Sequence, residues 1–116
     1  MYFEGRDLVS YAEPISSNEL REGNLYYAVN YIDTEMLQPE IETLVFIGRD
    51  LEPEDVGKAY FQDLSSHTEG IRYGWETAEG PAKFYSGSEN ELKHIFTYHK
   101  MLNELMKCSI RRDQSK

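Results

Sequence analysis

The sequence changes character once, near residue 87, and this change constrains the fold more than any other feature. Up to Tyr85, short apolar runs are separated by Gly, Pro, Asn and Asp, which is typical of short strands joined by turns. From Ser88 onward, apolar residues recur at helical spacing for about six turns. The pattern predicts an α+β domain in which a small, strongly bent antiparallel sheet of about five strands packs against one long C-terminal helix.

The length of the chain predicts a single domain. A chain of 116 residues can bury enough surface for one core but not for two. We expect residues 1–87 to be mainly β, residues 88–110 to form the helix, and residues 113–116 to be a frayed tail.

Strand patterns occur in several short segments: Leu8–Ala12, Asn24–Asp33, Ile41–Gly48, Lys58–Leu64, Ile71–Thr77 and Ala82–Tyr85. The segment Asn24–Asp33 is apolar on both faces, so we expect a central strand that is covered on both sides. The helix would cover one side. A second layer or a second subunit would cover the other, and a homodimer is one way to supply it.

The predicted helix begins at a recognisable cap. Ser88 and Glu91 have the Ser-x-x-Glu spacing of a capping box. At 100° per residue, Glu104 and Cys108 lie away from the apolar stripe, which consists of Leu92, Ile95, Phe96, His99, Leu102, Met106 and Ile110.

The segment Glu19–Asn24, followed by Tyr27, Ala28 and Val29, resembles the diverging turn and following strand of SH3-like barrels. The resemblance covers about 25 residues and implies a small, strongly bent antiparallel sheet or SH3-like open barrel. The paired tryptophans and the terminal proline-tyrosine signature of the peptide-binding members are missing. Recognition of proline-rich ligands is therefore not implied.

Charge and composition exclude some classes of protein. The formal net charge is −9, and residues 1–87 carry 17 Asp or Glu against 6 Lys or Arg, which argues against nucleic-acid binding. No segment has the roughly 20 apolar residues of a membrane span. The N-terminal residues lack a signal-peptide pattern, and one cysteine, Cys108, suits a reducing compartment. We expect a soluble cytoplasmic protein.

No motif indicates catalysis, a metal or a cofactor. The acidic loop Asp50–Asp55 departs from the calcium-loop pattern because Pro53 stands where the chain must coil. His67 follows two serines and could be imagined as a base, but nucleophilic triads are assembled by geometry between distant segments. We therefore expect no catalytic residue, no metal site and no cofactor.

The many tyrosines favour a binding surface. We expect an aromatic and acidic strip for protein contact or self-association, consisting of Tyr73, Trp75, Glu52, Glu54 and Asp55. The first hypothesis is therefore a non-enzymatic domain that acts by protein-protein contact. The second is an acidic immunity or inhibitor protein for a basic toxin. The third is a small-molecule enzyme or ligand-binding barrel that uses tyrosines and His67 around a pocket.

Overall fold

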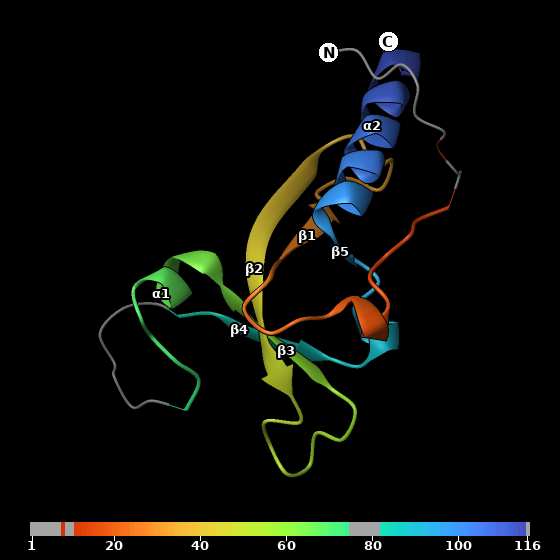
Figure 1. Ribbon diagram of the computed structural model, residues 1–116. Helices are drawn as coiled ribbons and strands as arrows, with labels where there is room; N and C mark the ends of the chain where they lie inside the picture. The colour runs from red at the N-terminus through yellow and green to blue at the C-terminus, as the bar shows by residue number, and fades with distance from the viewer. Residues whose placement is uncertain (1–7, 9–10, 75–81, 116) are drawn as a thin grey trace.

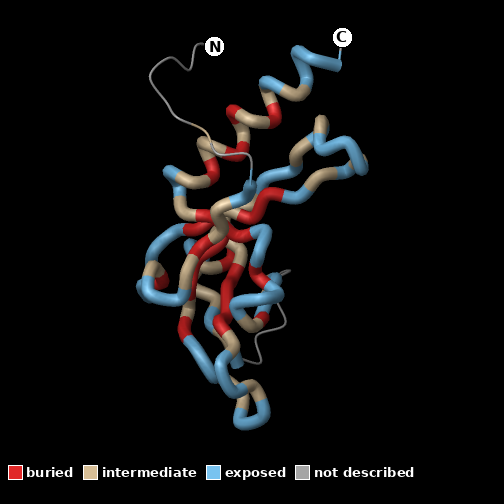
Figure 2. Tube along the Cα trace, turned by 90° about the vertical axis from the view of Figure 1, so that its right-hand side faces the viewer, coloured by how far each residue is buried: buried red, intermediate tan, exposed pale blue. Residues whose placement is uncertain are grey.

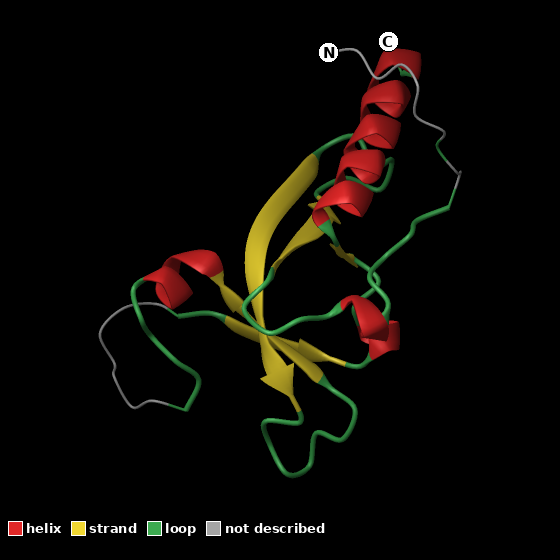
Figure 3. Ribbon diagram, viewed as in Figure 1, coloured by secondary structure: helices red, strands yellow, loops and turns green. Residues whose placement is uncertain are grey.

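The computed structural model describes residue 8, residues 11–74 and residues 82–115. This part of the chain forms a sheet with helical segments at its ends (Figures 1 and 3). The strands are β1 (Leu25–Tyr31), β2 (Pro39–Arg49), β3 (Ala59–Asp63), β4 (Phe84–Gly87) and β5 (Ile95–Phe96). The helices are α1 (Leu64–Thr68), α2 (Tyr98–Gln114) and the 3-10 helices η1 (Ser17–Glu19) and η2 (Glu89–Glu91).

The five strands form one sheet in the order β4-β3-β2-β1-β5, and every pairing is antiparallel. The predicted α+β class, with an antiparallel sheet and a C-terminal helix, is confirmed. The sheet is not closed into a barrel, and β4 and β5 are its two edges.

Strand β2 is the middle strand of the sheet and bends along its length (Figure 1). Its first part pairs with β1 and its last part pairs with β3. The register shifts between Phe46 and Gly48, as in a β-bulge, which increases the bend of a strand. Gly48 is buried there with a φ of 144°, and a Cβ would lie 3.3 Å from a methyl carbon of Leu51. The bend therefore depends on a glycine at this position.

Apolar residues cover both faces of β1, as its two apolar faces predict. Tyr26 and Ala28 belong to the main core, together with Leu44, Phe46, Phe61 and Ile95. Val29 belongs to a second core on the α2 side, together with Phe96 and Met101. Buried residues run along the middle strands and the α2 interface, while the β2–β3 loop at the bottom of the view contains exposed and intermediate residues (Figure 2). Because both cores are formed within one chain, β1 needs no second subunit to cover it.

The predicted start of the C-terminal helix at Ser88 is wrong, because α2 begins at Tyr98. The Ser88 capping box does form, with Ser88 N and Oγ donating to Glu91 Oε1 at 3.0 and 2.9 Å, but it caps only η2. Ile95 and Phe96 then pair with β1 and point into opposite cores. Burial on both faces of a sheet requires a period of two, and this requirement overrides the local helical pattern.

The predicted buried stripe is confirmed at Met106 but is wrong at four positions of α2. Glu104 and Cys108 are buried, whereas His99 and Ile110 are exposed. The turn after β1 packs against this part of α2, with Cys108 Sγ 3.6 Å from the carbonyl oxygen of Met36. Glu104 is paired with Lys107 at 2.6 Å. The turn after β1 therefore determines which side chains of α2 are buried, and helical periodicity alone does not predict this contact.

The predicted strand Ile71–Thr77 is not formed over its described residues, and residues 75–77 lie outside the described residues. A short helix, α1, precedes it instead. Asp63 caps this helix by accepting from Ser66 N at 3.0 Å, and Gly70, with a φ of 92°, turns the chain back over its end. The predicted strand Leu8–Ala12 is also not formed at its described residues, of which Tyr11 and Ala12 are exposed.

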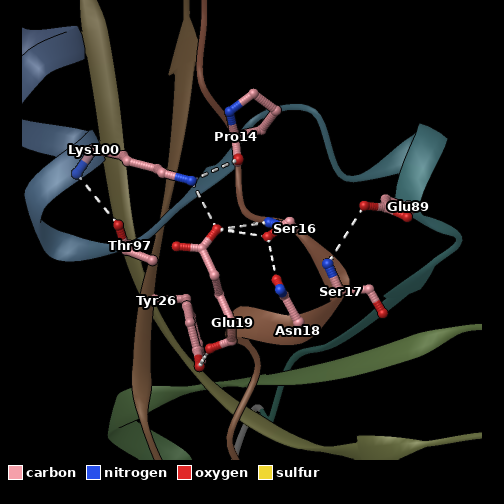
Figure 4. Close-up of polar contacts among 9 residues, drawn as sticks. All are labelled: Pro14, Ser16, Ser17, Asn18, Glu19, Tyr26, Glu89, Thr97 and Lys100. Atoms are coloured by element: carbon pink, nitrogen blue, oxygen red, sulfur yellow. Dashed lines mark hydrogen bonds and ion pairs between the residues drawn. The ribbon is translucent and has the colours of Figure 1, made fainter.

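The segment before β1 contacts both β5 and α2, and Figure 4 shows its contact with Lys100 of α2. Ile15 N donates to Ile95 O at 2.9 Å, and Lys100 Nζ lies 2.7 Å from Glu19 Oε1. Burial opposes the charge of Glu19, but hydrogen bonds from Lys100 and Ser16 outweigh it and lower the pKa of this carboxyl. These contacts hold η1 over the main core, where Leu20 is buried.

Candidate functional site

The loop between β2 and β3 is tied together by its own polar groups. Asp50, with a φ of 52°, accepts from Gly57 N through Oδ1 at 2.6 Å, and Asp50 N donates to Lys58 O at 3.0 Å. Lys58 Nζ lies 3.2 Å from Asp55 Oδ1. The loop therefore has a defined shape although many of its residues are exposed.

Two tyrosines outside this loop hold its carboxylates. Tyr60 donates a short hydrogen bond to Asp55, and Tyr73 donates one to Glu52 at 2.5 Å. The rings of Tyr60 and Tyr73 pack edge to face with centroids 5.4 Å apart, and Phe84 continues the stack at 5.3 Å from Tyr73. We call this region the acidic tyrosine surface, defined by Glu52, Glu54, Asp55, Tyr60 and Tyr73.

Charge and hydrogen bonding shift the pKa values of these groups. The hydroxyl of Tyr60 lowers the pKa of Asp55, while burial and the Asp55 carboxylate raise the pKa of Tyr60 well above its usual range. The bond to Glu52 is the main cause of the raised pKa of Tyr73. The two hydroxyls therefore stay protonated, and the Asp55 carboxylate remains charged, at neutral pH.

The structure brings together three of the five residues that the sequence predicts, Tyr73, Glu52 and Asp55. Glu54 lies in the same loop and is exposed, and Trp75 lies outside the described residues. Sequence reasoning missed Tyr60, which completes the stack. Its position next to the acidic loop, at the start of the predicted strand Lys58–Leu64, was the available signal.

A second region is a pocket at the gap between the two edges of the open sheet. Its volume is about 330 Å³, within the range of roughly 300–1,000 Å³ typical of small-ligand sites. Strand β4 supplies Tyr85 and Ser86 from one edge, and His94 and Ile95 line it from the other edge. We call it the edge pocket. Its floor is apolar and includes Ala28, Leu44, Leu92 and Ile95.

Polar groups converge on this floor. The Tyr85 hydroxyl lies 3.3 Å from Glu42 Oε2, and the side chains of Asn30 and His94 line the same space. Burial and the Glu42 carboxylate raise the pKa of Tyr85 to about 12. Burial lowers the pKa of His94 below its usual 6.5, so the ring is neutral near pH 7.

His67, which the sequence analysis considered for a pocket, does not line the edge pocket. It lies in α1, where burial and the nearby Arg72 lower its pKa. No group of three or more His, Cys, Asp or Glu side chains in the described part of the chain is arranged to hold a metal ion. Neither described α-helix has the length and apolar character that crossing a membrane requires.

Comparison with known proteins found no family model that matches this chain, and no similar curated protein or solved structure.

Proposed function

We propose that this protein acts without catalysis, by contact between its acidic tyrosine surface and a basic protein partner. The observation that carries the proposal is that Tyr60 and Tyr73 hold Asp55 and Glu52 in place on an exposed loop. Carboxylates that are already positioned lose little side-chain entropy when a partner binds.

The rest of the loop adds features that suit a protein contact. Glu54 is exposed beside the two held carboxylates, and Val56 is 87% exposed at the same loop. An exposed apolar side chain among fixed negative charges favours a partner with a basic surface and a small apolar contact. Trp75, which lies outside the described residues, stays a predicted contact residue for the same partner.

Two narrower forms of this function were expected from the sequence. An acidic inhibitor or immunity protein for a basic toxin is the form that the excess of carboxylates favours, because long-range attraction speeds its association. A homodimer has less support, since both faces of β1 are covered within one chain.

A second candidate function, binding of a small molecule, is favoured by one observation. Polar side chains from both sheet edges converge on the apolar floor of the edge pocket.

The test uses a photo-crosslinking amino acid at position 54, with position 35 as the control. Glu35 is also an exposed glutamate, but it lies in the turn after β1. In cells that express the protein, we expect a basic protein to be captured from position 54 and not from position 35. Association of that purified partner should slow steeply as salt rises, and Tyr73→Phe should weaken it. Equal capture from both positions, or no capture at either, contradicts the proposal.

A further inference from the structure

We propose that the edge pocket binds a small organic cation, in which an ammonium or guanidinium group is joined to a short apolar portion. This inference does not rest on the contact with a basic partner, because the edge pocket shares no residue with the acidic tyrosine surface.

The charged residues around the pocket favour a positively charged ligand. Glu42 and Glu91 line it, and none of its lining residues is Lys or Arg. Lys83 lines an adjoining hollow that shares Asn30 and Glu42 with the edge pocket, and Glu40 in that hollow offsets its charge. An anionic ligand would face two carboxylates, whereas a cation would gain from both.

Glu42 is the carboxylate that is available to a ligand. Its contact with Tyr85 is long, at 3.3 Å, and uses only Oε2. Within the described residues, Oε1 of Glu42 has no hydrogen-bond partner. Glu91 differs, because its Oε1 already accepts from Ser88 N and Oγ. Glu42 is therefore the group that would accept the hydrogen bonds of the cation.

The remaining walls suit the apolar portion of the ligand. Leu44 and Ile95 are buried and form part of the floor, and Tyr85, which is 38% exposed as a residue, lines the side. A tyrosine ring beside a carboxylate offers a second attraction for a cation, through its π-face. The neutral ring of His94 offers a hydrogen-bonding group and adds no repelling charge.

A free amine or guanidino compound and the arginine or lysine side chain of another protein present the same chemistry to this pocket. The pocket volume, about 330 Å³, accommodates either a small amine or guanidino compound or one long side chain. The shared feature is the cationic head on an apolar stem.

The test is an NMR titration of the full chain with three probes of one shape. Phenethylamine is the cation, 2-phenylethanol the neutral analogue and 3-phenylpropionate the anion. We expect phenethylamine to bind about tenfold more tightly than 2-phenylethanol, with 3-phenylpropionate weakest. The amide signals that move should be those of β1, β2, β4 and residues 91–95.

Two variants separate local recognition from general attraction. Glu42→Gln keeps the shape of the side chain and should weaken phenethylamine binding about tenfold. Glu35→Gln removes the same charge from the exposed turn after β1 and should change binding less than about twofold. Circular dichroism establishes that both variants remain folded.

The source of the cation is decided by comparing agmatine with a blocked peptide that contains one arginine. Equal affinities indicate a free small molecule, and much tighter binding of the peptide indicates a side chain, so either result supports the cation site. Equal binding of phenethylamine and 2-phenylethanol would overturn the proposal. Unchanged binding in folded Glu42→Gln, or no binding of either cation, would also overturn it.

Discussion

The two candidate regions are both built from tyrosines beside carboxylates, yet they use the pairing differently. In the acidic tyrosine surface, Tyr60 and Tyr73 lie in an aromatic stack and each makes a short hydrogen bond to an acid. In the edge pocket, Tyr85 reaches Glu42 only at 3.3 Å, and its ring is partly exposed. The first arrangement fixes carboxylates on a surface, whereas the second leaves a carboxylate free to bind.

The difference follows from where the pairs lie in the chain. Asp55 and Tyr60 are close in sequence, at the end of one loop and the start of the strand that follows it. Glu42 and Tyr85 come from β2 and β4, which do not pair with each other. Glu52 and Tyr73 are 21 residues apart, but Tyr73 packs on Tyr60 beside the same loop, whereas Glu42 and Tyr85 line a gap that the open sheet leaves unfilled.

The largest expected difference between the two regions comes from removing one tyrosine ring from each. Tyr73→Ala should lower the free energy of unfolding by about 2 kcal/mol, because Tyr73 packs between Tyr60 and Phe84. Tyr85→Ala should cost less than about 1 kcal/mol, because that ring is partly exposed and makes no such stack. Urea denaturation measures both. Similar losses in the two variants would mean that the two tyrosines have equal structural roles.

Removal of the hydroxyls alone should have a smaller effect. Tyr60→Phe takes a hydrogen bond from Asp55 and should lower the melting temperature by a few degrees. Tyr85→Phe breaks only a long contact and should change it by about one degree or less. Thermal unfolding followed by circular dichroism makes the comparison, and an equal or greater loss for Tyr85→Phe would contradict it.

The contribution of the Tyr60–Asp55 hydrogen bond to the stability of the folded protein should depend on pH. The pKa of folded Asp55 lies below its ordinary value of 3.8, so the charged form is stabilised by folding. This stabilisation is fully present above that ordinary value and is lost as the pH falls through the folded pKa. The stability difference between wild type and Tyr60→Phe should therefore narrow between neutral pH and strongly acidic pH. A difference that stays constant in urea denaturation across that range would show that Asp55 charge is not involved.

The smallest expected effect concerns the pocket. Because burial lowers the pKa of His94, the ring should titrate below 6.5 in the NMR spectrum. A His94→Gln variant assigns the signal. A value above 6.5 would mean that Glu42 and Glu91 influence the ring more than burial does, and the pocket would then be more strongly negative than its geometry indicates.

Much of the sheet could be predicted from residue patterns. The expected strands Asn24–Asp33, Ile41–Gly48 and Lys58–Leu64 contain most of β1, β2 and β3, because apolar runs between turn residues identify short strands. The expected strand Ala82–Tyr85 overlaps β4 at Phe84 and Tyr85. The helix boundary and the helix face were wrong, because β5 and the turn after β1 contact α2 in ways that a local period does not contain.

Of the proposed binding residues, the sequence indicated the acidic loop, whose carboxylates are clustered in the chain, and Tyr73, which contacts that loop. It did not indicate the edge pocket. Glu42 and Tyr85 were individually ordinary, and only the order β4-β3-β2-β1-β5 brings them to one gap.

Residue patterns are sufficient to predict the α+β class, the apolar cover on both faces of β1 and the acidic character of the β2–β3 loop. These follow from local composition and from the alternation of side chains along a strand. Tertiary structure decided that Ile95 and Phe96 form a strand, that Glu104 and Cys108 are buried, and that the sheet stays open. Each of these depends on pairing between distant segments, where burial on two faces outweighs the weak preference of a few residues for a helix.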